Sequence, residues 1–143
     1  MSTPPIRNAF SIDVEDYFQV SALAPHFPRQ IWDQQTCRVE RNVDRMLGML
    51  ADRQAHATFF TLGWVAERFP DMVKRIVAGG HELASHGYGH QRVSDLTPAE
   101  FLDDVTRAKK ILEDLGGQAV IGYRAPSFSI GENNLWALDI FAD

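Results

Sequence analysis

The alternation of secondary structure is clearest in residues 57–84, which read ATFFTLGWVAERFPDMVKRIVAGGHELA. Residues 57–62 have the composition of a short buried strand. A helical pattern follows over residues 64–78, interrupted at Pro70, and residues 82–84 predict a further, very short strand. The stretch therefore predicts two strands joined by helices, which is the unit from which parallel sheets are built.

The same alternation continues on both sides of this stretch. Residues 9–14 and 119–123 predict two more short strands, and residues 38–52 repeat apolar side chains on one helical face. Thr97 and Glu100 form a capping-box pattern that opens another helix. Successive strand–helix units predict a parallel sheet with right-handed crossovers. We therefore expect an α/β fold.

Length and composition indicate a single globular domain over residues 1–143. Apolar residues make up 45% of the chain and charged residues 23%, which excludes disordered and collagen-like proteins. A complete eight-unit (β/α) barrel takes about 250 residues, so this chain holds roughly half of one. Because a periodic helix is still running at Asp143, we expect a C-terminally truncated domain; a half-barrel-sized sheet is the alternative.

Charge and cysteine content restrict the partners and the compartment. The net charge of −5 argues against nucleic acid as a partner. No apolar run approaches the ~18 residues of a membrane-spanning helix, and the N-terminus has no signal-peptide pattern. Cys37 is the single cysteine and cannot form an internal disulfide. These features predict a cytoplasmic protein without a membrane span.

Histidines gather in the segment that follows the strand over 82–84. His86 and His90 are four residues apart, so two imidazoles could converge on one metal ion, and Gly87 and Gly89 let the backbone curl tightly. The alternative is a pair of solvated loop histidines. His81 precedes the strand, at the opposite end of the sheet, and we expect it to be structural.

Carboxylates occupy the end of the first predicted strand, where Asp13, Glu15 and Asp16 follow apolar residues. Alternation along a strand places Asp13 and Glu15 on one face. Ligands bind at the carboxyl ends of parallel strands. Carboxylates gathered there would repel one another unless a cation or an arginine lies between them. Asp16 has a second interpretation, as the N-cap of a turn over residues 17–20.

An arginine closes the strand predicted over residues 119–123. Arg124 could hold a carboxylate through two hydrogen bonds and fix its orientation. Pro126 stiffens the following turn, and Phe128 offers an apolar wall. Trp32 is the best candidate among the tryptophans for stacking on a sugar, although a tryptophan is more often part of a core.

In this order, these segments resemble the NodB-homology polysaccharide deacetylases. Three motifs, SIDVEDYF (11–18), GHELASHGY (80–88) and YRAPSF (123–128), are similar to those of one subfamily. This subfamily is associated with exopolysaccharide and exosortase loci and is called the PEP-CTERM-associated group. The resemblance runs from about Ala9 onward. It implies a distorted (β/α) barrel, of which this chain would be the N-terminal half.

The resemblance also implies roles for individual residues. Members remove acetyl groups from N-acetylated sugars with a divalent metal, usually Zn²⁺. Asp13 matches the catalytic base, and Arg124 matches the arginine that orients the base. His86 and His90 match two metal ligands. The segment after Arg124, with Pro126, Ser127 and Phe128, is expected to contact the substrate.

The sequence departs from the family pattern in two places. The common first motif has adjacent aspartates, whereas Val14 follows Asp13 here, so we expect Glu15 to be the metal carboxylate, with Asp16 as the alternative. The family's general acid, a histidine, would lie beyond Asp143.

The resemblance implies a hydrolase of carbon–nitrogen bonds in carbohydrate metabolism, which removes N-acetyl groups from a polysaccharide or oligosaccharide in exopolysaccharide biosynthesis. Two alternatives stay open. One is a related barrel amidohydrolase that acts on a small cyclic amide. The other is a non-catalytic sugar-binding or metal-binding fragment.

Overall fold

Three short parallel strands form the centre of the fold. In a computed structural model, which describes residues 8–142, the strands lie in the order β1-β2-β3. Their bounds are Ser11–Val14 for β1, Thr58–Thr61 for β2 and Glu82–Ser85 for β3. Asp13 lies opposite Phe60, and Phe60 lies opposite Ala84. This register confirms the predicted α/β fold with a parallel sheet.

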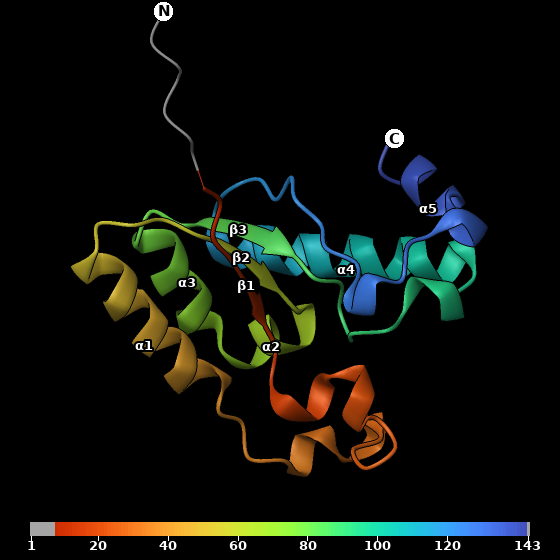
Figure 1. Cartoon of the computed structure of the whole chain (residues 1–143), viewed down its shortest axis with the longest axis horizontal. Coiled ribbons are helices and arrows are strands. Elements are labelled where there is room, and N and C mark those ends of the chain that lie inside the picture. The colour runs from red at the N-terminus through yellow and green to blue at the C-terminus, as the bar shows by residue number, and fades with distance from the viewer. Residues whose placement is uncertain (1–7, 143) are drawn as a thin grey trace, which may run out of the picture.

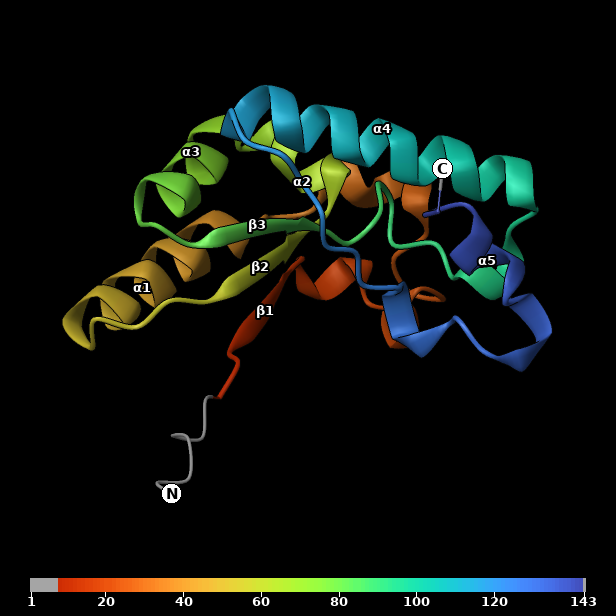
Figure 2. The ribbon, with the colours of Figure 1, turned by 90° about the horizontal axis from the view of Figure 1, so that it is seen from above.

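Helices connect the strands and cover one face of the sheet. Their bounds are Val39–Asp52 for α1, Gly63–Arg68 for α2, Pro70–Ala78 for α3, Pro98–Gly116 for α4 and Trp136–Asp139 for α5. In Figure 1, α1 and α3 lie to the left of the strands and α2 lies near their lower end, whereas the blue segment that follows α4 runs above β3. Figure 2 shows α2, α3 and α4 gathered on the far side of β3 from β1. The segment after α4 thus lies along the free edge of β3.

The ends of α4 follow the capping rules read from the sequence. The Thr97 hydroxyl accepts the N–H of Glu100 at 3.3 Å, and the Glu100 carboxylate accepts the N–H of Thr97 at 2.8 Å. Gly117 ends the helix in the left-handed conformation, with a φ of 65°. The helices in the described part of the chain are all too short or too polar to cross a membrane.

The strand predicted over residues 119–123 is reduced to a single bridge between Ser85 and Tyr123. The Ser85 N–H donates to the Gly122 carbonyl at 2.8 Å, and the Arg124 N–H donates to the Ser85 carbonyl at 2.9 Å. The peptide groups of Val120 bond instead to side chains of α4. Glu113 accepts its N–H at 2.9 Å, and Lys109 donates to its carbonyl at 2.7 Å. The ladder is therefore interrupted, although the segment still runs beside β3.

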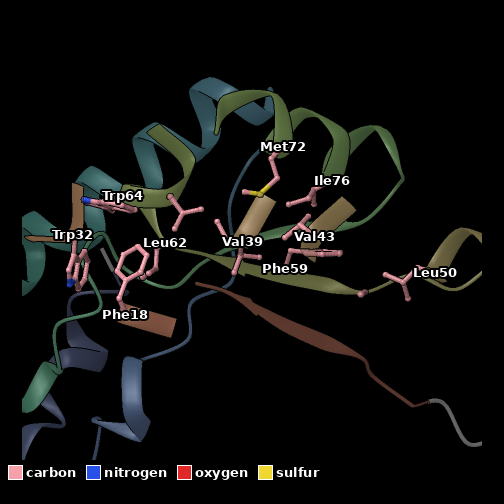
Figure 3. Packing of buried hydrophobic residues seen from close by; sticks show 13 residues of the cluster. Phe18, Trp32, Val39, Val43, Leu50, Phe59, Leu62, Trp64, Met72 and Ile76 are labelled. Atoms are coloured by element: carbon pink, nitrogen blue, oxygen red, sulfur yellow. The ribbon is translucent and has the colours of Figure 1, made fainter. Parts of the chain in front are cut away.

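The largest core cluster fills the space between the sheet and the helices (Figure 3). Phe18, Phe59 and Leu62 are completely buried in it. Trp32 is also part of this core, with 6% of its surface exposed, and its indole N–H donates to the Phe27 carbonyl at 3.0 Å. Trp32 packs edge-on against Phe18. Trp32 is therefore a core residue, which is the more common role of a tryptophan, and the alternative that it stacks on a sugar finds no support.

Candidate active site

The carboxyl ends of the strands bring together side chains from distant parts of the sequence. Asp13 lies in β1 and Glu15 follows it, while His86 comes directly after β3. His90 ends the loop after His86, and Arg124 lies on the segment that pairs with Ser85. Parallel strands all end at one edge of the sheet, so residues that follow them share that edge. The five predicted catalytic and metal residues therefore meet at one site.

Glu15, His86 and His90 form a compact set of metal-type donor atoms. Each offers one atom, and these atoms all lie within 4.8 Å of one another. Glu15 Oε2 is 2.7 Å from His90 Nε2 and 3.6 Å from His86 Nε2. Glu15 Oε2 is nevertheless a buried oxygen without a hydrogen-bond partner in residues 8–142. Two imidazoles and one carboxylate match the donor set of a catalytic zinc site that keeps positions open for other ligands.

The ring of His86 is fixed in the orientation that a metal ligand needs. Its Nδ1 donates to the Arg124 carbonyl at 2.7 Å, because a carbonyl oxygen only accepts. Nε2 then carries the lone pair and faces Glu15. Burial lowers the pKa of His86, and the neighbouring carboxylates of Asp13 and Glu15 only partly oppose this. The neutral ring is the form that binds metal ions.

Asp13 lies beside this cluster and is held by Arg124. The guanidinium donates to Asp13 Oδ1 at 2.5 Å and to the Ser11 hydroxyl at 2.7 Å, and it lies over the ring of Phe60 at 4.0 Å. The other oxygen, Oδ2, is 4.0 Å from His86 Nε2. One oxygen of Asp13 is therefore tied to Arg124, and the other faces the donor cluster.

Asp16 has a different role from its neighbours. Its carboxylate accepts the N–H of Tyr17 at 3.0 Å, that of Arg38 at 2.5 Å and that of Val39 at 2.9 Å. Asp16 is buried and joins the start of a short 3-10 helix to the start of α1. The N-cap interpretation is therefore confirmed. The alternative that Asp16 is the metal carboxylate finds no support, because backbone amides already occupy its oxygens.

A cavity of about 660 Å³ opens over the site. Asp13, Glu15, His86, His90 and Arg124 line it, together with Ser127 and Phe128 from the turn after Arg124. The ring of Phe128 is 100% exposed. Pro126 is buried and does not line this cavity, whereas Ser127 and Phe128 do.

Some residues of the site were not found by the sequence reasoning. Ser11 supports Arg124, and it could have been found, because it lies two residues before Asp13 on the same strand face. Ser21 and Ser127 both line the cavity and form a hydrogen bond through their hydroxyls at 2.6 Å. Arg92 lines this cavity and also a second one of about 860 Å³ beside it. Ser21 and Arg92 carry no signal in the sequence that marks them as site residues.

His81 is placed far from the site, as predicted. It precedes β3 at the opposite end of the sheet, and its ring packs against Phe59 with 5.1 Å between the ring centroids. Its Nδ1 accepts the N–H of Ala57 at 3.3 Å. This histidine is therefore part of the structure of the sheet and not of the donor cluster.

Known proteins resemble this chain in sequence. The family model described as polysaccharide deacetylase matches residues 30–139. A peptidoglycan-N-acetylglucosamine deacetylase of Bacillus cereus is 36% identical over 96 residues, which are 66% of this chain and 35% of that protein. The chain thus spans about a third of the length of this relative. Asp13 and Glu15 precede the residues that the family model matches.

Solved structures share the fold. A putative polysaccharide deacetylase from Mycobacterium smegmatis superimposes with a TM-score of 0.74 at 28% identity, over 96% of this chain and 50% of that one. A CE4 family pseudoenzyme from Bacillus anthracis gives 0.71 at 20% identity, over 93% of this chain and 40% of that one, and shows the fold alone. These likenesses confirm the predicted NodB-type α/β architecture. Together with the match over residues 30–139, they establish that this chain belongs to the NodB-homology polysaccharide deacetylase family.

Proposed function

We propose that the protein is a metal-dependent N-deacetylase, which hydrolyses the N-acetyl groups of a polysaccharide or oligosaccharide to acetate and a free amine. The observation that carries the proposal is the convergence of Glu15, His86 and His90 around the unpartnered Glu15 Oε2. Asp13 and Arg124 lie directly beside this cluster. Residues 1–143 would be part of the deacetylase domain.

The donor set supports Zn²⁺ as the cation. Zinc binds histidine nitrogens and carboxylate oxygens in tetrahedral sites, and catalytic sites use three protein ligands. When bound, such a cation lowers the pKa of a water to ~7 and polarises a carbonyl oxygen. Glu15, His86 and His90 would hold it.

The remaining residues of the site would handle the proton of the attacking water. Asp13 would accept this proton on Oδ2, the oxygen that faces the donor cluster. Arg124 would keep the Asp13 carboxylate in this orientation through the bond to Oδ1. Substitution of Asp13 should therefore stop turnover without removing the cation.

The cavity wall supports an extended sugar as the substrate. The exposed ring of Phe128 would lie against an apolar sugar face, and the hydroxyls of Ser127 and Ser21 would bond to polar groups of the substrate. Pro126, which is buried, would stiffen the turn that carries these two residues. We further propose a role in exopolysaccharide biosynthesis and a cytoplasmic location, which rest on the sequence features alone.

Two substitutions test the proposal because they should fail differently. The purified full-length protein is assayed for acetate release from N-acetylglucosamine oligomers and for zinc content by elemental analysis. We expect His86→Ala to lose both zinc and activity, and Asp13→Asn to keep zinc but lose activity. His56→Ala is a matched control, because His56 is exposed and does not line the cavity. Equal zinc content in the wild type and His86→Ala would refute the assignment.

A non-catalytic binding protein is the second candidate. Within residues 8–142, no imidazole lines the cavity except those of His86 and His90, so no separate histidine is available there to protonate the leaving amine. Zinc binding without acetate release by the full-length protein, over a panel of N-acetylated oligosaccharides, would favour this candidate over the enzyme.

A further inference from the structure

The two histidines of the donor cluster are held in different ways. His86 donates through Nδ1 to the Arg124 carbonyl, which fixes its ring. The Nδ1 of His90 is buried and has no hydrogen-bond partner in the described part of the chain. Metal-binding histidines usually donate their second nitrogen to a fixing partner. The position of His90 is therefore set by its backbone and by the packing of its ring against His86.

Hydrogen bonds to α2 and α4 hold the backbone that precedes His90. At the start of α2, the Gly63 N–H donates to the Gly87 carbonyl at 2.9 Å, and the Trp64 N–H donates to the Tyr88 carbonyl at 3.0 Å. On the other side, Asp104 of α4 accepts the Tyr88 N–H on Oδ2 at 3.0 Å.

Arg29 completes the support of this loop. It opens a short 3-10 helix over Arg29–Gln34, and its Nη1 donates to the Gly89 carbonyl at 3.2 Å. Asp104 and Arg29 both line the cavity of about 860 Å³ that adjoins the site, and His90 lines it too. Neither Asp104 nor Arg29 lines the cavity that contains the donor cluster.

Side-chain atoms of Asp104 and Arg29 lie very close to the two glycines of the loop. A Cβ atom on Gly87 would lie 2.6 Å from Asp104 Oδ2, and Gly87 has a φ of +77°. A Cβ atom on Gly89 would lie 1.9 Å from Arg29 Nη1. A Cβ atom at either position would therefore displace the side-chain group that supports the loop. The loop ends at His90 itself, which has a φ of +55°, a left-handed conformation that a non-glycine residue keeps only when its surroundings impose it.

We propose that Asp104, assisted by Arg29, is a positioning residue of the metal site, which holds the loop before His90 so that Nε2 of this histidine faces Glu15. The inference rests on the proposed function, because it assumes that the donor cluster binds a cation. Asp104 acts only through His90.

The surroundings of Asp104 explain why removal of its carboxylate should disturb the backbone before His90. Burial raises the pKa of Asp104, and the N–H groups of Tyr88 and Gly89 and the charge of Arg29 oppose this rise. Asp104 is half-buried, and a carboxylate that is partly removed from water depends on such partners. Without the carboxylate, the Tyr88 N–H would lose its acceptor, and the strained backbone at His90 could relax.

The test measures Zn²⁺ affinity by competition with a chromophoric chelator, for the full-length protein in the wild type and in Asp104→Ala. Loss of a partner that orients a metal ligand costs about 10-fold to 100-fold in affinity, and we expect a loss in this range. Asp104→Asn keeps one acceptor oxygen and should lose less Zn²⁺ affinity. This variant replaces Asp104→Ala in the test if Asp104→Ala fails to fold. Asp103→Ala is the matched control, because Asp103 is the exposed neighbour on the same helix.

The same substitution made in a His90→Ala variant separates a positioning role of Asp104 from general damage to the fold. In His90→Ala, the further change Asp104→Ala should alter the remaining Zn²⁺ affinity by less than about 2-fold, because the residue that it positions is gone. The absorption spectrum of bound Co²⁺ should change in Asp104→Ala but not in Asp103→Ala.

The outcomes separate this inference from the proposed function. Wild-type affinity in both Asp104 variants would overturn the positioning role while leaving the metal site intact, and so would an equal loss in the wild-type and His90→Ala backgrounds. Failure of the wild type to bind Zn²⁺ would overturn the proposed function and this inference together.

Discussion

Replacement of Asp16 by alanine tests whether this carboxylate is structural or a metal ligand. The substitution removes the acceptor for the N–H groups of Tyr17, Arg38 and Val39. Loss of an N-cap costs ~1 kcal/mol, and each buried donor left unpaired costs about 1–3 kcal/mol. Taking the lower ends, we expect the free energy of unfolding to fall by about 3 kcal/mol. For a chain of this size, that lowers the Tm by about 10 °C.

Calorimetry and urea unfolding of Asp16→Ala measure this loss, and chelator competition measures the Zn²⁺ affinity of the folded variant. We expect a large loss of stability together with wild-type metal affinity, because Glu15 and not Asp16 would be the carboxylate ligand. Asp52→Ala is the control, since Asp52 is exposed at the end of α1 and should leave both quantities unchanged. Wild-type stability combined with a metal affinity reduced at least 10-fold would refute this reasoning, because it would make Asp16 the ligand.

Three further predictions follow from the burial and contacts of single residues. Phe128→Ala should raise KM for N-acetylated oligosaccharides several-fold and leave the Tm unchanged, because the ring is fully exposed at the cavity. Trp32→Ala should lower the free energy of unfolding by about 3–5 kcal/mol in urea titrations, as expected for a large core aromatic. Burial lowers the pKa of His81 below 6.5, so the unfolded chain binds the proton more tightly, and stability should fall as the pH drops from about 7 to about 5. His81→Gln should flatten this dependence, as measured by the denaturation midpoint at each pH.

Much of the site could be predicted because parallel strands end at a common edge. Asp13 lies near the end of β1, Glu15 follows this strand and His86 follows β3, so a parallel sheet places all three at one edge. The spacing of His86 and His90 adds a second imidazole. The choice of Glu15 over Asp16 also agrees with the structure, since Glu15 belongs to the donor cluster.

Other features depend on contacts that sequence patterns do not encode. Lys109 and Glu113 bond to Val120 from α4, which interrupts the strand predicted there. Trp32 looks like a loop residue in the sequence, yet its ring packs in the core. The hydrogen bond from the Tyr88 N–H to the Asp104 carboxylate joins residues that are 16 positions apart in the sequence. Each is a tertiary contact, and local propensity carries no information about its partner.

The central claim is that Glu15, His86 and His90 bind a single divalent cation. The most direct measurement is an anomalous difference map from crystals grown with Zn²⁺, recorded at the zinc absorption edge. We predict one strong peak about 2.0–2.2 Å from a carboxylate oxygen of Glu15 and from Nε2 of each histidine. A map with no peak between these three side chains, or with the zinc held by Asp16 instead, would contradict the account.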